Sequence, residues 1–208
     1  MSEDPLEFAG LLCSRLCHDL MSPVGAITNG LELLASEDDP AMRAQALELV
    51  ADSARASIDR LKYFRLAFGW GAGGDQLLDT AELKGVIAAL AGANRRITLG
   101  WLIEQPSMPR ARARILLILA MVAIDALVRG GALQIAAEGH EIVVRAEGPR
   151  LVLDAQIRAV LAGEGDSTAM SSRNSAAWLA RRLAEAAHGT LGVSDAEPGV
   201  LLLAATLG

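Results

Sequence analysis

The sequence predicts an α+β fold, in which an N-terminal helical hairpin is followed by a C-terminal α/β sandwich. Three observations support this prediction. Apolar residues recur at three- and four-residue steps through the first third of the chain. A glycine-dense segment, 69–75, interrupts that pattern. Beyond it, helical patterns alternate with short apolar runs, an order typical of helices packed on one face of a mixed sheet.

Composition and charge narrow the class of protein. Hydrophobic residues make up 52% of the 208 residues and aromatic residues only 3%, which favours closely packed helices. The net charge of −6 argues against nucleic acid as a partner, and we interpret the basic cluster Arg110, Arg112 and Arg114 as a solvated first helical turn. The longest apolar run, 115–128, is too short for a bilayer. The acidic N-terminus is unlike a signal peptide, so we expect a cytoplasmic protein without a membrane partner.

One apolar stripe defines the first helix, because at about 100° per residue its members share one side. They are Leu6, Cys13, Leu16, Cys17, Leu20, Val24, Ile27, Leu31 and Leu34. On this side we expect Cys13 and Cys17 to pack as small apolar residues rather than bind a metal. His18 lies opposite and faces water or a partner. Pro23 indicates either a kink or, after Ser22, a second helix start.

A second helix is predicted from Pro40 to Phe68, joined to the first by the short segment 36–40, which only antiparallel neighbours allow. Two helices cannot cover such stripes alone, so a second copy would complete a four-helix bundle, and we expect a homodimer. The predicted core of that bundle is apolar on both helices. It comprises Leu16, Leu20, Val24, Ile27 and Leu31 with Leu47, Ala54, Ile58 and Leu61.

The glycine-dense segment divides the chain into residues 1–70, the hairpin, and residues 76–208, the sandwich. Periodicity in the second part predicts four helices and five strands. The helices are expected at 80–91, 110–128, 153–162 and 173–187, and the strands at 96–104, 132–138, 141–147, 190–195 and 199–206.

His18, Asp19 and Pro23 resemble the phosphoacceptor box of bacterial sensor histidine kinases, which is a histidine, an acidic residue, three variable positions and a proline. The hairpin is similar to the dimerisation and phosphotransfer domain of these kinases, and residues 76–208 resemble their ATP-binding domain. Their nucleotide-binding residues, however, are replaced. Met121 and Asp125 stand where two asparagines would hold magnesium and ATP, Ala146 and Arg150 replace an aspartate and a glycine, and the segment SSRNSAAW lacks the glycines of a phosphate loop.

A phosphoacceptor helix beside a degenerate ATP-binding domain resembles the ChpT-type histidine phosphotransferases of bacterial cell-cycle phosphorelays. This resemblance implies that His18 takes a phosphoryl group from one receiver aspartate and passes it to another, without ATP, cofactor or metal in this chain. Mg²⁺ is expected on the partner receiver domain. Asp19 would orient the imidazole or stabilise its charged form. The implied donor is the receiver of a CckA-like hybrid kinase, and the implied acceptors are CtrA- and CpdR-like response regulators.

The surface around His18 predicts where a receiver docks. It comprises Ser14, Met21, Ser22, Gly25 and Asn29. Counting from the hairpin turn places Arg55 to Asp59 at the height of His18, so Arg55 is a candidate to hold the phosphoryl group; the alternative is a solvated face with an Arg55–Asp59 pair. Two other functions stay open, an active sensor-type histidine kinase and a non-catalytic dimeric scaffold for receiver domains.

Overall fold

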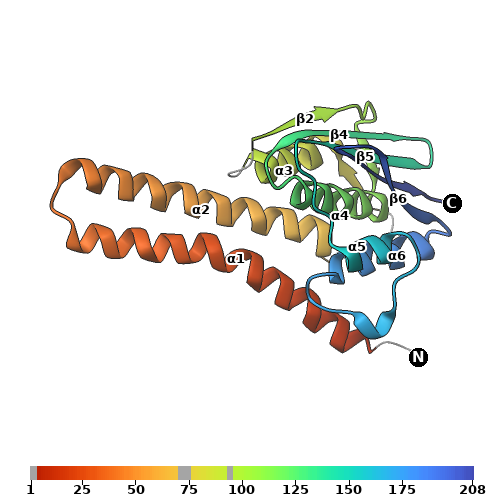
Figure 1. Ribbon diagram of the computed structural model, residues 1–208, viewed down its shortest axis with the longest axis horizontal. Coiled ribbons are helices and arrows are strands. Elements are labelled where there is room, and N and C mark those ends of the chain that lie inside the picture. Colours follow the sequence, from red (N-terminus) through yellow and green to blue (C-terminus); the bar gives the residue numbers. More distant parts are fainter. Residues whose placement is uncertain (1–3, 70–75, 93–95) are drawn as a thin grey trace.

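The computed structural model describes residues 4–69, 76–92 and 96–208. Two long antiparallel helices, α1 (Pro5–Ser36) and α2 (Pro40–Phe68), extend from an α/β sandwich (Figure 1). The predicted hairpin is confirmed, and its second helix has the predicted bounds. The predicted linker lies outside the described residues except for Gly69, so the division into 1–70 and 76–208 stays a prediction.

The same pair of residue types begins both helices of the hairpin. The side chain of Asp4 accepts a hydrogen bond from the backbone of Leu6 at 2.9 Å, and that of Asp39 accepts one from Ala41 at 3.2 Å. A proline follows each aspartate at the first helical position, where it has no hydrogen bond to lose. These caps explain why both helix starts can be predicted from the sequence.

Pro23 lies inside α1, which continues through it without interruption. The axis of α1 changes direction part-way along its length (Figure 1). Of the two predicted alternatives, the structure therefore shows a kink and not a second helix start, as expected where proline removes one hydrogen bond from the helical ladder.

The rest of the chain covers only half of the apolar stripe on α1. One half, made of Leu16, Leu20, Ile27 and Leu34, is partly buried against the same chain. The other half is exposed; it consists of Leu6, Cys13, Cys17, Val24 and Leu31. Cys13 and Cys17 are thus exposed in the single chain, because α2 and the sandwich cover only one side of α1. Their packing in a dimer stays a prediction.

Gly30 lies where the two hairpin helices approach each other closely. It is buried, and a Cβ atom built on it would lie 2.6 Å from a methyl group of Val50. Gly25, little more than one turn earlier, is exposed and has nothing within 4 Å of such an atom. The two glycines differ in the space around them, although both sit within one helix.

We expect Gly25→Ala to raise the free energy of unfolding by about 1 kcal/mol, the difference in helix propensity between alanine and glycine. Gly30→Ala gains the same propensity but overpacks the helix contact, which costs about 1–3 kcal/mol, so this variant should be the less stable of the two. Urea unfolding at one fixed protein concentration measures both. Equal stabilisation of the two variants would show that Gly30 is not required for the close approach.

The sandwich has a five-stranded sheet in the order β2-β4-β5-β7-β6. Its strands are β2 (Ile97–Trp101), β4 (Gly131–Glu138), β5 (Glu141–Glu147), β6 (Thr190–Glu197) and β7 (Val200–Thr206). β2 pairs with β4 in parallel, and the other pairs are antiparallel. The predicted mixed sheet is therefore confirmed.

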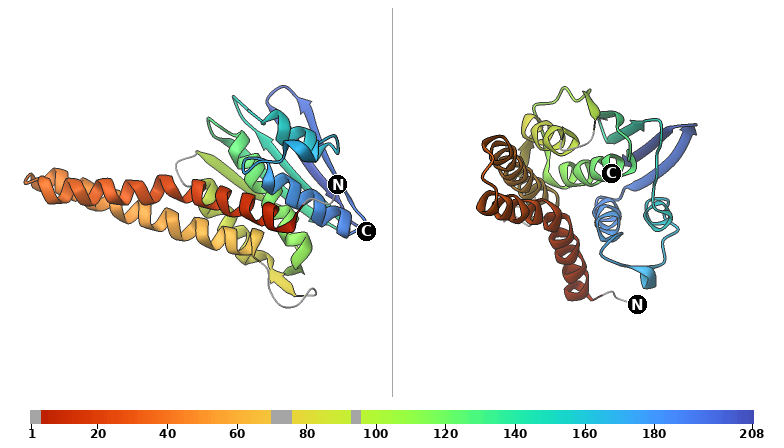
Figure 2. Two further views of the ribbon diagram at one scale, coloured as in Figure 1. Left: turned by 90° about the horizontal axis from the view of Figure 1, so that it is seen from below. Right: turned by 60° about the vertical axis from the view of Figure 1, so that its left-hand side comes forward.

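The helices of the sandwich lie on one face of the sheet (Figure 2). They are α3 (Thr80–Gly92), α4 (Arg110–Ala126), α5 (Ala155–Leu161) and α6 (Ser175–Ala186). Three short elements were not predicted: strands β1 (Leu77–Asp79) and β3 (Ser107–Pro109), which pair with each other, and a 3₁₀ turn at Ser167–Ala169. Three residues are too few to show a periodicity. The predicted α+β fold is confirmed.

The base of the hairpin is bound to α4. Arg114 Nε donates to the carbonyl of Ala67 at 3.0 Å and Arg110 donates to that of Gly69 at 3.2 Å, which satisfies carbonyl groups at the C-terminus of α2. Tyr63 is fully buried, donates to the carbonyl of Leu117, and has its pKa raised by that burial. Arg114 is only 7% exposed, so the interpretation of these arginines as a solvated turn is wrong.

The N-terminal half of α1 lies alongside α6 (Figure 2), where the guanidinium of Arg182 stacks on the ring of Phe8 at 4.1 Å. Phe8, Tyr63 and Phe64 belong to the same hydrophobic core as α4 and the sheet. The hairpin base and the sandwich are therefore packed as one body. None of the helices in the described ranges combines the length and the hydropathy that crossing a bilayer requires.

Candidate functional site

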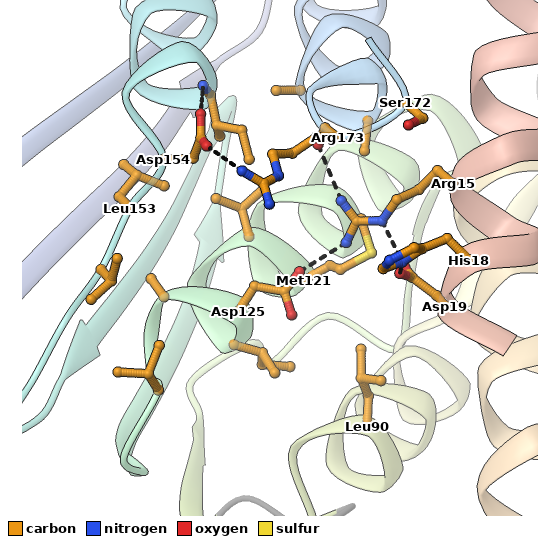
Figure 3. A pocket seen from close by; sticks show the side chains of 18 of the residues that line it. Arg15, His18, Asp19, Leu90, Met121, Asp125, Leu153, Asp154, Ser172 and Arg173 are labelled. Carbon is orange, nitrogen blue, oxygen red and sulfur yellow. Dashed lines mark hydrogen bonds and ion pairs between the residues drawn. The ribbon is translucent and has the colours of Figure 1, made fainter. Parts of the chain in front are cut away.

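His18 lines a pocket of about 650 Å³ between the hairpin and the sandwich (Figure 3). Helix α1 contributes His18, Asp19 and Arg15 to the lining, and α4 contributes Met121 and Asp125. The N-terminal region of α6 forms another wall. Residues far apart in the sequence thus meet around His18.

The imidazole of His18 is 83% exposed, and its Nδ1 lies 3.1 Å from Oδ1 of Asp19. A carboxylate oxygen can only accept, so Nδ1 must be the donor in this hydrogen bond. In the neutral ring the lone pair is then on Nε2. The sequence alone did not establish whether the adjacent residues His18 and Asp19 are in contact. Their hydrogen bond leaves Nε2 as the exposed nucleophilic nitrogen of His18.

Asp19 links His18 to the interior of the site. Its side chain is 20% exposed, and while Oδ1 accepts from His18, Oδ2 accepts from Arg15 Nε at 2.7 Å. A carboxylate that is held on both oxygens has little rotational freedom. Asp19 can therefore fix the orientation of the imidazole, and its charge can stabilise a positive ring; both predicted roles fit this geometry.

Arg15 makes contacts in three directions (Figure 3). Besides Asp19, it donates to Oδ2 of Asp125 at 2.9 Å and to the backbone carbonyl of Arg173 at 3.1 Å. Burial alone would lower the pKa of Arg15, but the carboxylates of Asp19 and Asp125 outweigh it and raise the pKa. Sequence reasoning missed Arg15, although its spacing of four residues from Asp19 is a recognisable signal for an ion pair.

The predicted docking residues share the exposed side of α1. Ser14, Met21, Ser22, Gly25 and Asn29 are all exposed, and Ser22 also lines the pocket with His18. Met21 is 72% exposed, so its apolar side chain is open to contact from outside the chain. The structure thus brings this surface together around His18, and its role in docking stays a prediction.

Arg55 and Asp59 are not among the residues that line the pocket with His18. Arg55 pairs with Asp52 at 2.8 Å and is 69% exposed, while Asp59 lies 3.8 Å from Lys62. Arg55 thus lies on a solvated face, as the alternative expects, but its ion pair is with Asp52 and not with Asp59. Its role toward the phosphoryl group stays a prediction. The arginine of α2 that lines the pocket is Arg60, about one turn further along.

Four residues stand at positions where histidine kinases bind the nucleotide, and in this structure each is apolar, paired with another side chain, or part of a different hollow. Met121 is 3% exposed, and Asp125 is paired with Arg15. Ala146 is buried in β5, and Arg150 lines a different hollow. Within the described ranges, no three side chains of the His, Cys, Asp or Glu types gather closely enough to hold a metal ion.

Comparison with known proteins identifies the family. The family model described as the histidine phosphotransferase C-terminal domain matches residues 80–199, which is more than half of the chain. The chain belongs to the histidine phosphotransferase family. The resemblance to ChpT-type histidine phosphotransferases is thereby confirmed for the part of the chain that carries the degenerate domain.

Two relatives support the assignment to the histidine phosphotransferase family. The protein phosphotransferase ChpT of Brucella abortus (strain 2308) is 35% identical over 136 residues, which are 65% of this chain and 63% of that protein. A solved structure described as a bacterial phosphotransferase is 26% identical, covers 99% of this chain and 98% of its own, and superposes with a TM-score of 0.84. The chain thus matches 63% of the length of the curated relative.

Proposed function

We propose that this chain is a histidine phosphotransferase, which relays a phosphoryl group between receiver aspartates through a phosphohistidine at His18 and does not bind ATP. One observation carries the proposal: Nδ1 of an exposed imidazole is held by Asp19, so that Nε2 is the free nucleophile. Membership of the histidine phosphotransferase family supports it.

The transfer needs little chemistry from the protein beyond positioning. The Nε2 lone pair of His18 attacks the phosphorus of the receiver's aspartyl phosphate, the N–P bond forms, and the P–O bond to the aspartate breaks with release of its carboxylate. The ring keeps its proton on Nδ1 and becomes positive, and Asp19 stabilises that charge. Attack by the carboxylate of a second receiver reverses these steps and returns a neutral imidazole.

The proposed partners are response-regulator receiver domains of a cell-cycle phosphorelay in the cytoplasm. By resemblance, a CckA-like hybrid kinase receiver is the donor and CtrA- and CpdR-like regulators are the acceptors. Mg²⁺ bound to the receiver stabilises the negative charge of the transferred phosphoryl group, so this chain needs no metal of its own. Arg60, which lines the pocket with His18, adds positive charge where an acidic receiver site would approach, whereas Arg173 is paired there with Asp154.

A second copy of the chain is the proposed occupant of the exposed stripe on the hairpin. Leu31 is 54% exposed, and on α2 Leu47, Ile58 and Leu61 are 59%, 52% and 50% exposed. Side chains of this size, repeated along both helices, form an apolar surface of the kind that is buried in dimeric bundles. The homodimer would bury the outer half of each stripe. The core predicted from the sequence also includes Leu16, Leu20 and Ile27, which are partly buried within the single chain.

The experiment that tests the function mixes the purified chain with a receiver domain carrying a radiolabelled aspartyl phosphate, and then adds a second receiver. We expect label to move to the chain and onward to the second receiver, and we expect no label on the chain after incubation with magnesium and labelled ATP alone. Label taken from ATP would indicate a kinase. Receiver binding without any transfer would indicate a scaffold, and either result would overturn the proposal.

A further inference from the structure

We infer that Arg15 is a positioning residue that holds the phosphoacceptor histidine through Asp19 and anchors both to the sandwich. The inference rests on the proposed function, because it concerns the geometry of the same histidine. It also gives the degenerate domain a part in the reaction, since two of the three groups that Arg15 binds belong to the sandwich.

The contacts form one continuous chain from the sandwich to the reacting nitrogen. Asp125 and the carbonyl of Arg173 accept from one end of the Arg15 guanidinium, at 2.9 and 3.1 Å. Its Nε binds Oδ2 of Asp19 at 2.7 Å, and Oδ1 of Asp19 meets His18 Nδ1 at 3.1 Å. Each link lies within hydrogen-bond distance, so the rotamer of Asp19 is set from both sides.

Burial separates this ion pair from ordinary surface pairs. The side chain of Arg15 is 14% exposed and that of Asp19 is 20% exposed, whereas the Arg55–Asp52 pair on the same hairpin is 69% and 65% exposed. Exposed pairs are screened by water and contribute little, but half-buried pairs with several partners hold a defined geometry. The site therefore fixes Asp19 in a way that a surface ion pair does not.

The planar guanidinium is the group that this geometry requires. Arg15 sends donors to three acceptors in fixed directions, which the single ammonium of lysine cannot reproduce. The carboxylate of Asp19, which Arg15 holds in place, puts a negative charge beside His18. That charge is matched when the ring becomes positive during transfer.

The test compares Arg15→Gln and Arg15→Lys in the full-length chain, with Arg158→Gln as the matched control. Arg158 also bridges two elements, through a 2.8 Å contact with Asp195, but it does not line the His18 pocket. Two quantities are measured. The first is the tautomer of His18, from the side-chain ¹⁵N shifts, and the second is the single-turnover transfer rate at saturating receiver.

We expect Arg15→Gln to shift the His18 tautomer away from Nδ1–H and to slow transfer about tenfold, with receiver affinity unchanged. Arg15→Lys should restore part of the rate, and Asp125→Asn should shift the same ¹⁵N signals less. In the Asp19→Asn background, Arg15→Gln should have no further effect, because Arg15 acts through Asp19.

Several results would overturn the inference. Two concern the ¹⁵N shifts of His18: no change of tautomer in Arg15→Gln, or no change of shift in Asp125→Asn. Two concern the transfer rate: an equal loss of rate in Arg158→Gln, or an equal loss from Arg15→Gln whether residue 19 is Asp or Asn. An effect independent of Asp19 would mean that Arg15 contacts the receiver directly. If the unmodified chain transfers no label, the proposed function fails instead, while the tautomer measurement still decides the role of Arg15.

Discussion

Alanine at His18 is expected to abolish phosphoryl transfer, with a loss of at least about 10³-fold in the rate of label uptake. The substitution removes the nitrogen that forms the N–P bond, and no positioning by Asp19 can replace that nitrogen. Because the side chain is 83% exposed, the fold should be unaffected. Transfer from a labelled receiver measures the rate, and circular dichroism checks the fold.

His140 offers a matched control for this variant. It is exposed and lies between β4 and β5, away from the hairpin, so His140→Ala should transfer label at the unmodified rate. The label on the unmodified chain should be labile in acid and stable in alkali, as expected for a phosphohistidine. Label that persists on His18→Ala would show that another group accepts the phosphoryl, and the assignment of His18 would be wrong.

Two glutamates on the exposed stripe are expected to dissociate the homodimer. In Leu31→Glu combined with Ile58→Glu, two-fold symmetry would place four carboxylates in one apolar interface, and an unpaired charge there costs several kcal/mol. Both side chains are about half exposed in the single chain, so each protomer should still fold. Sedimentation at micromolar concentration should show a dimer for the unmodified chain and a monomer for the variant.

The control for the dimer experiment is Leu102→Glu, which changes a leucine that is 65% exposed and lies outside the hairpin. This variant should sediment as the unmodified chain does. A monomeric unmodified chain would contradict the homodimer directly. A dimer that survives both hairpin glutamates would show that the copies associate through another surface.

The helices of the hairpin were predictable because their signals are local. An aspartate and a proline mark each start, and three residues join the two helices. The contact partners of Arg15 were not predictable, since Asp125 and Arg173 follow it by 110 and 158 residues. Only the packing of α1 against the sandwich brings these groups to it.

The height of Arg55 relative to His18 was harder to predict, for a related physical reason. The estimate counted equal numbers of residues from the turn along two straight helices, but α1 contains Pro23 between the turn and His18. A bend changes the height that a given number of residues reaches. The count from the turn therefore crosses the kink at Pro23 before it reaches His18.

The arginines of α4 that bind the end of α2 have a consequence for how the protein unfolds. Arg114 and Arg110 hold the last carbonyls of α2, and Tyr63 is inserted into the core of the sandwich. The base of the hairpin and the sandwich share one core, so we expect the amide hydrogens in that core to exchange by global opening. The distal hairpin has only its own helix pair for support within the chain, so we expect its hydrogen-exchange protection to depend on the proposed second copy.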